Sequence, residues 1–151
     1  MSELKERLRA DLTASMKDRD EVRTRTLRMV LAGISKEEVA GSAARELDDA
    51  EIERVIAREA KRRREAAEAF AGAGRGDQAA AERAEGEILA GYLPEQLGDE
   101  ELAGLVSAVI AAAGAAGPSA MGQVMRLVTP KVAGRAEGSR VAAEVRRQLA
   151  G

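Results

Sequence analysis

The amino-acid sequence contains no cysteine and no histidine among its 151 residues. Without cysteine the chain can form no disulfide, thiolate metal site or cysteine nucleophile, and a reducing compartment is its natural setting. Without histidine it lacks the commonest general base and the commonest ligand of transition metals. These two absences exclude most hydrolase and metalloenzyme mechanisms. We therefore predict no catalytic residue, no metal site and no cofactor.

Aromatic residues and long apolar runs are also scarce. The chain has one tyrosine, one phenylalanine and no tryptophan, so its core must be built from aliphatic residues and much alanine. Alanine is the best helix former, whereas aromatic and β-branched residues favour strands. No stretch approaches the roughly 18 apolar residues of a membrane span, and the charged start, Met1–Arg7, does not resemble a signal peptide. We expect an all-α protein in the cytoplasm, without membrane association.

The first ninety residues predict four helices, because apolar residues recur at the three-to-four spacing of a helical face. The third helix has the clearest start: Asp48 and Glu51 form a capping box, and Leu47 and Ile52 occupy the positions of a hydrophobic staple. Glycines end this helix and a fourth begins near residue 77. The apolar stripe of the first helix is Leu4, Leu8, Leu12 and Met16, and that of the second includes Val22, Met29, Val30 and Ile34.

A boundary is predicted near Leu93, because Pro94 disfavours the α conformation in the residue before it. We place a four-helix N-terminal domain at residues 1–93 and a small three-helix C-terminal domain at 94–151. In the second domain we expect Ser119 to cap a helix and Pro130 to end it. The predicted core of that domain is Leu102, Val106, Ile110, Met125, Val141 and Val145.

Charge is uneven along the chain. The overall charge is −2, yet residues 118–151 hold six basic and two acidic side chains. Charge asymmetry of this kind suggests an end that binds polyanions. A solvated basic face without a partner is the plainer interpretation of the same residues.

A glycine-rich basic loop is the most informative segment. Gly134 and Gly138 can adopt positive φ, and the helix that follows presents its N-terminus to anions. Lys131, Arg135 and Arg140 bracket this loop, so all five residues are candidates for binding a phosphate of RNA. A tight helix–helix turn, in which the glycines serve only the backbone conformation, explains the segment equally well. Gly122, inside the preceding helix, would allow another backbone to come close.

A second basic cluster lies on the predicted third helix. Phosphate contact is possible for this cluster. A solvated helix face, paired with Glu51, Glu65 and Glu68, is the preferred interpretation. The cluster consists of Arg54, Arg58, Lys61, Arg62, Arg63 and Arg64.

The sequence resembles the GatB/YqeY family along essentially its whole length. The matching motifs are Tyr92-Leu93-Pro94-Glu95-Gln96-Leu97, Met121-Gly122-x-Val124-Met125 and Pro130-Lys131-Val-x-Gly134-Arg135-Ala136-Glu137-Gly138-x-x-Val141. The resemblance implies two helical parts, the second similar to the tail of the tRNA-dependent amidotransferase B subunit. It also implies the family label of a carbon–nitrogen ligase with glutamine as amido donor. Glu137 stands where the family usually has Asp.

Three functions remain open at this point. The leading hypothesis is a module that associates with tRNA or other RNA. A helical adaptor that binds a protein partner is the alternative, and a subunit or relic of an amide-transferring ligase is the third. Salt dependence separates the first two, because phosphate contacts weaken steeply with salt and apolar helix docking does not.

Overall fold

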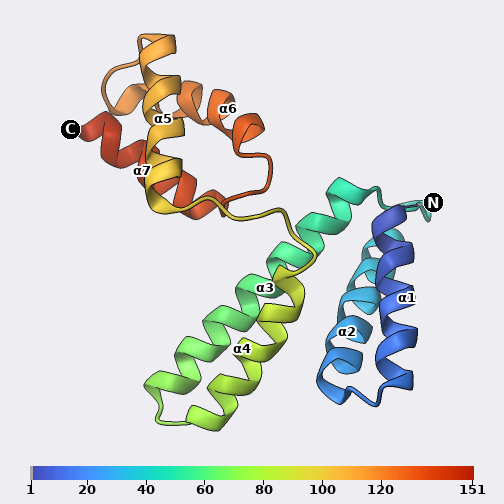
Figure 1. Cartoon of the computed structure of the whole chain (residues 1–151). Coiled ribbons are helices and arrows are strands. Elements are labelled where there is room, and N and C mark those ends of the chain that lie inside the picture. The colour runs from blue at the N-terminus through green and yellow to red at the C-terminus, as the bar shows by residue number, and fades with distance from the viewer. Residues whose placement is uncertain (1) are drawn as a thin grey trace. The chain divides into compact units, whose positions relative to one another are not determined.

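The computed structural model describes residues 2–151, and Figure 1 follows the chain from blue to red. Over these residues the chain forms seven α-helices and one short 3₁₀-helix and no strand, which confirms the all-α prediction. The chain divides into two compact units, unit 1 (Met1–Leu93) and unit 2 (Pro94–Gly151).

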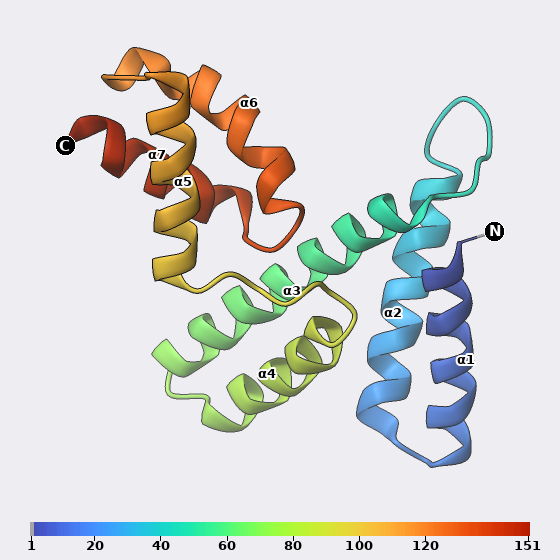
Figure 2. The same cartoon turned by 45° about the horizontal axis from the view of Figure 1, so that its top comes forward.

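Unit 1 begins with a helical hairpin, α1 (Glu3–Lys17) and α2 (Glu21–Glu38). Ser2 caps α1 by accepting a hydrogen bond from the Lys5 N–H, and Asp20 caps α2 in the same way from Arg23. Such caps satisfy N–H groups that have no partner inside the helix. An exposed loop of about ten residues then leads to α3, as Figure 2 shows.

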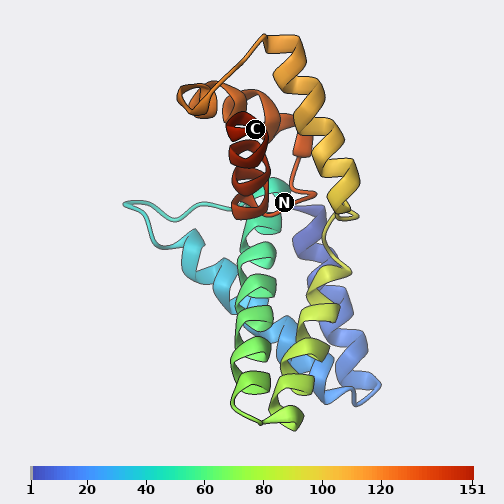
Figure 3. The same ribbon diagram turned by 90° about the vertical axis from the view of Figure 1, so that its left-hand side faces the viewer.

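The second hairpin of unit 1 is formed by α3 (Asp49–Gly72) and α4 (Gly76–Ala90), which run antiparallel and side by side (Figure 3). Alanine and glycine at the contact let the two helices come close: a Cβ added at Gly86 would lie 3.6 Å from the Cβ of Arg63. The Arg63 guanidinium lies between the helices, 3.3 Å from Glu85 and 3.5 Å from Glu82. Arg25 of α2 also donates to Glu85, at 2.9 Å, so this buried carboxylate joins three helices.

The core of unit 1 is aliphatic, as the scarcity of aromatic residues requires. Burial of such side chains stabilises a fold by roughly 25 cal/mol per Å² of apolar surface removed from water. Beside this core, the Lys5 ammonium lies 2.8 Å from Glu38, and this contact lowers the pKa of Glu38. The buried members of the core are Leu8, Leu27, Val30, Ile34, Leu47, Ile52, Val55, Ile56, Leu89 and Tyr92.

Tyr92 anchors the end of α4 to α1. Its hydroxyl donates to Asp11 at 2.5 Å, and the guanidinium of Arg7 lies 4.6 Å from the centre of its ring. Burial, with the hydrogen bond to Asp11 as the second cause, raises the pKa of Tyr92 to about 12. The only tyrosine of the chain therefore fixes the last helix of unit 1 to the first.

Unit 2 contains α5 (Asp99–Ala113), the 3₁₀-helix η1 (Pro118–Ala120), α6 (Met121–Val132) and α7 (Gly138–Ala150). Three acidic residues occupy the first turn of α5, where they interact favourably with the helix dipole. Four of the six predicted core residues are buried, and Ile110 and Met125 are only partly buried. The buried members are Leu97, Leu102, Val106, Val109, Val124, Val128, Val132, Ala136, Val141, Val145 and Leu149.

Three local predictions are wrong. Ser119 does not cap α6, because it lies inside η1 and the N-cap is Ala120, which has no side-chain cap. Pro130 does not end α6, which continues to Val132. Proline lacks the N–H that would bond to the carbonyl four residues earlier, yet the last turn still closes through Ala133 N–H, which donates to the carbonyl of Thr129. The predicted apolar stripes are also wrong at two positions, because Met16 is 44% exposed and Val22 36% exposed.

Among residues 2–151 no single helix is long and apolar enough to cross a membrane. The two segments Asp99–Ala113 and Pro118–Val132 reach that length and composition only together, as a pair bent by 97°. Their buried apolar residues belong to the core of unit 2.

Candidate nucleic-acid interface

The loop between α6 and α7 has an unusual backbone. Ala133 has φ of 49° and Gly134 has φ of 77°, so two successive residues are left-handed. Only glycine adopts this conformation without a steric cost, so Ala133 carries strain that Gly134 does not. The Arg135 N–H then bonds to the carbonyl of Val132 at 3.0 Å, which closes the turn.

This loop binds the segment Pro94–Gly98, which opens unit 2. The Leu97 N–H donates to the carbonyl of Arg135 at 2.7 Å, and the Gln96 amide donates to the carbonyl of Gly134 at 3.3 Å. In return, Nε of Arg135 donates to the carbonyl of Glu95 at 2.9 Å. Two motifs about forty residues apart are therefore hydrogen-bonded to each other. We call this set of contacts, with those of Arg140, the clamp.

Arg140, in the first turn of α7, completes the clamp. Its guanidinium donates to the carbonyl of Leu97 at 2.8 Å and to Asp99 at 3.0 Å. The guanidinium of Arg135 also lies 4.0 Å from Glu101. Both predicted phosphate-binding arginines thus have acceptors within the chain, and carboxylates from the start of α5 offset part of their charge.

The five candidate residues do not all join this arrangement. Gly134, Arg135 and Arg140 meet around Pro94–Asp99, as their contacts show. Lys131 is exposed near the end of α6 and forms no ion pair among the described residues. Gly138 is the first residue of α7, and a Cβ added there would have no atom within 4 Å. The space beside the Cα of Gly138, at the N-terminus of α7, is therefore not filled by other atoms of the described chain.

The N-terminus of α7 lacks a side-chain cap. Glu137 occupies the N-cap position, and no cap hydrogen bond reaches α7 from its side chain. Glutamate is a poor N-cap residue, which accounts for this feature. The first N–H groups of α7 lack partners from preceding turns of the helix and carry its positive dipole end, which suits an anion.

The charge of unit 2 as a whole differs from that of its last 34 residues. Unit 2 holds six basic and six acidic side chains, because Glu95 and the acidic start of α5 belong to it. Asp99 lies against Arg140, and Glu101 lies against Arg135. These carboxylates offset the positive charge of residues 118–151 at the two arginines that were predicted to bind phosphate. This neutralisation is not visible in the sequence, because the carboxylates precede the arginines by about forty residues.

Gly122 does not serve the internal packing that a helical glycine often indicates. It lies in the first turn of α6, and a Cβ added there would have no atom within 4 Å. No other helix of unit 2 therefore requires glycine at this position.

Carboxylates of the described residues include no group of three or more that is placed to hold a metal ion. The largest resolved shifts of pKa affect Tyr92 and Glu144. The pKa of Glu144 is lowered to about 2, first by its hydrogen bond from Arg147 and then by that from Gln148. The causes of the two shifts are the burial of Tyr92 with its bond to Asp11, and the bonds of Glu144 to Arg147 and Gln148, so neither shift involves a loop candidate.

The described chain is thus an all-helical protein of two units, the second of which carries an arginine clamp on its own first segment. The family model described as Yqey-like protein matches residues 5–149, and the chain belongs to this family. The match covers both units and includes every motif on which the resemblance was based. No curated protein matches the chain.

Proposed function

We propose that this protein is an RNA-associating module, and that Lys131, Gly134, Arg135, Gly138 and Arg140 form its phosphate-contacting surface. The observation that supports the proposal is the fixed position of two partly exposed guanidinium groups beside an uncapped helix N-terminus. The similarity of unit 2 to the tail of the tRNA-dependent amidotransferase B subunit makes tRNA the first RNA to test. The proposal assigns no catalytic step to this chain.

The clamp leaves donors for a ligand. An arginine side chain has five N–H groups, and Arg135 uses Nε on the carbonyl of Glu95 while its side chain remains 40% exposed. The side chain of Arg140 is 37% exposed, and its contacts to the chain come from one terminal nitrogen. Because both groups are already held in place, binding a phosphate would cost less side-chain entropy than binding by flexible arginines.

Lys131 provides the cleanest test, because it is the candidate cation that the clamp does not use. Replacing Arg135 would release Pro94–Leu97 as well as remove a charge, so folding and binding effects would be mixed. Lys131→Glu changes only an exposed side chain. Arg146→Glu on α7 is a matched control, since Arg146 is exposed and has no ion pair among residues 2–151.

The experiment measures binding of the full chain to labelled bulk tRNA by fluorescence anisotropy, between about 50 and 200 mM salt. We expect Lys131→Glu to weaken binding about tenfold, or ~1.4 kcal/mol, and to reduce the salt slope by about 1. Arg146→Glu should have a much smaller effect. Equal losses in the two variants would indicate general electrostatics and contradict the proposed site.

Absence of measurable binding by the unaltered protein would end the RNA proposal. The helical adaptor for a protein partner would then be the function to pursue. Binding that persists unchanged as salt rises would have the same consequence, because phosphate contacts release counterions and must weaken.

A further inference from the structure

A dense group of basic residues outside the loop lies in the middle of α3, which as a whole holds six basic and six acidic side chains. Residues 53–64 hold six basic and two acidic side chains. Arg63 is directed between α3 and α4, where Glu82 and Glu85 neutralise it. The other five cations, Arg54, Arg58, Lys61, Arg62 and Arg64, are exposed.

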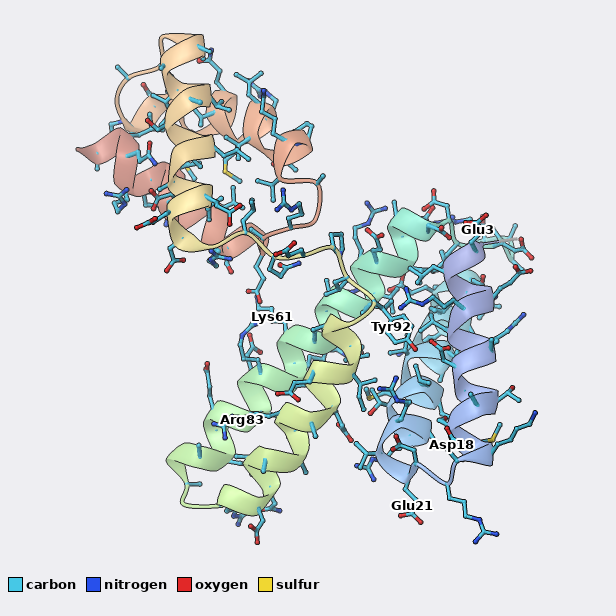
Figure 4. All side chains as sticks on the ribbon, viewed as in Figure 1. Glu3, Asp18, Glu21, Lys61, Arg83 and Tyr92 are labelled. Atoms are coloured by element: carbon cyan, nitrogen blue, oxygen red, sulfur yellow. The ribbon has the colours of Figure 1, made fainter. Side chains whose placement is uncertain are left out.

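Three of these cations form a row along the outer face of α3. Arg54, Arg58 and Lys61 follow one another at spacings of four and three residues, which places them on one side of a helix. The opposite side carries the buried residues Ile52 and Ile56. Lys61 projects from α3 on the side away from the α1–α2 hairpin (Figure 4). The row, as we call these three residues, extends over about 10 Å along the helix axis.

The ion pairs of the row are exchangeable. Arg58 pairs with Glu37, and the Lys61 ammonium lies 4.0 Å from Glu65. Arg54 has no ion pair among the described residues. Exposed pairs of this kind contribute only about 0–1 kcal/mol, so a phosphate can replace the carboxylate at little cost.

The exposed surface around the row favours a polyanion over other partners. The large hydrophobic side chains that are exposed in the described chain are Met16, Val22, Val39 and Leu127, and none of them lies on α3. A membrane-surface helix needs large apolar side chains beside its cations, and a protein interface needs buried aromatic or aliphatic anchors. The row offers only charge and hydrogen-bond donors, which match the phosphate groups of a nucleic acid.

We propose that the row on α3 binds the phosphate backbone of RNA, without base selectivity, and supplies most of the salt-dependent part of the affinity. This inference rests on the proposed function. It divides the work between the two units: the clamp arginines of unit 2 lie against Asp99 and Glu101, whereas the cations of the row are exposed on α3. Three phosphate contacts would give a salt slope of about 2 for a single strand and nearly 3 for a duplex.

The test compares two double charge reversals of equal charge change in the full chain. Arg54→Glu with Lys61→Glu alters the row. Arg19→Glu with Arg75→Glu alters two exposed cations at the hairpin turns of unit 1, which have no ion pair in the described chain. Far-UV circular dichroism checks that all variants keep their helices. Binding to labelled tRNA and to an unrelated RNA of equal length is measured over a range of salt.

We expect the row variant, which removes two of the three contacts, to lower the salt slope by roughly 1.4 to 1.8, and the control variant to leave it nearly unchanged. An equal loss in both variants would overturn the inference. The inference would also be overturned if Lys131→Glu lowered the salt slope and the row variant did not. The proposed function would then hold without any role for the row. A row variant that keeps its RNA affinity but loses binding to phosphatidylserine vesicles would overturn it in favour of a lipid surface.

Discussion

Arg140→Ala removes the side chain that completes the clamp. The carbonyl of Leu97 would lose its charged donor, and Leu97 is only 5% exposed, so water replaces that donor poorly. A hydrogen bond to a charged group contributes about 1.5–3 kcal/mol. The lower end applies because the guanidinium is partly exposed. The ion pair to Asp99 adds little, since that carboxylate is 98% exposed.

The expected result is a local loss of about 1.5 kcal/mol, which corresponds to roughly tenfold faster hydrogen exchange where exchange occurs by local opening. The amide to follow is that of Leu97, which donates to Arg135 in the clamp. Mass spectrometry of peptic fragments that cover residues 94–102 measures it. Tyrosine fluorescence would not serve, because the only tyrosine, Tyr92, lies in unit 1 and there is no tryptophan.

Arg146→Ala on the same helix is the control, and an exposed substitution of this kind changes stability by less than about 0.5 kcal/mol. Arg140→Lys should fall between the two, because an ammonium can reach one acceptor but lacks the fork of a guanidinium. Exchange of the Leu97 amide as slow in Arg140→Ala as in Arg146→Ala would refute a stabilising role for the Arg140 side chain.

Two further predictions concern Tyr92 and the left-handed turn. Ultraviolet titration should show Tyr92 ionising near pH 12 in the folded protein. Because this pKa is higher than the value of about 10 in the unfolded chain, it stabilises the fold fully below pH 10, and that stability is lost as the pH rises through 12. Tyr92→Phe should remove this pH dependence, and ionisation near pH 10 in the native protein would contradict the burial argument. Ala133→Gly should stabilise unit 2 by about 0.5 kcal/mol, because relief of left-handed strain exceeds the entropy that glycine adds to the unfolded chain. Gly134→Ala should destabilise unit 2 by about 1 kcal/mol. Denaturant unfolding followed by hydrogen exchange measures both changes in the free energy of unfolding, and changes of the same sign would contradict the predicted strain.

The parts of the fold that the sequence predicted well depend on neighbours within one turn. Asp48 accepts a hydrogen bond from the N–H of Glu51 at 2.8 Å, and Leu47 and Ile52 are both buried, as the start of α3 required. The reciprocal half of the capping box is replaced, because the Glu51 carboxylate pairs with Arg45 instead. Caps and apolar periodicity act over a few residues, so a sequence window contains all their partners.

Ser119 and Pro130 show where the same local rules fail. Ser119 has the chemistry of a cap, yet Pro118 starts a 3₁₀ turn that shifts the beginning of α6 to Met121. Pro130 lies in the last turn of α6, which continues for only two more residues. Both errors concern a helix end, where two conformations differ by a small free energy that packing decides.

The candidate site was predicted as a segment but not as a set of contacts. The positions of Gly134, Arg135 and Arg140 in a turn and a helix start followed from glycine and periodicity. That Arg135 binds the carbonyl of Glu95, forty residues earlier, could not follow, because no sequence window contains both partners. For the same reason the charge of residues 118–151 was counted without the carboxylates that lie against it.

The clamp also determines where the chain can be divided. A fragment that began at Asp99, the first residue of α5, would contain all three helices of unit 2 and keep most of its core. It would nevertheless lack the carbonyls of Glu95 and Leu97, so Arg135 and Arg140 would lose their backbone acceptors. A fragment that began at Pro94 would retain them. Five residues that belong to no helix, Pro94–Gly98, are thus part of the smallest piece that can reproduce the native tail.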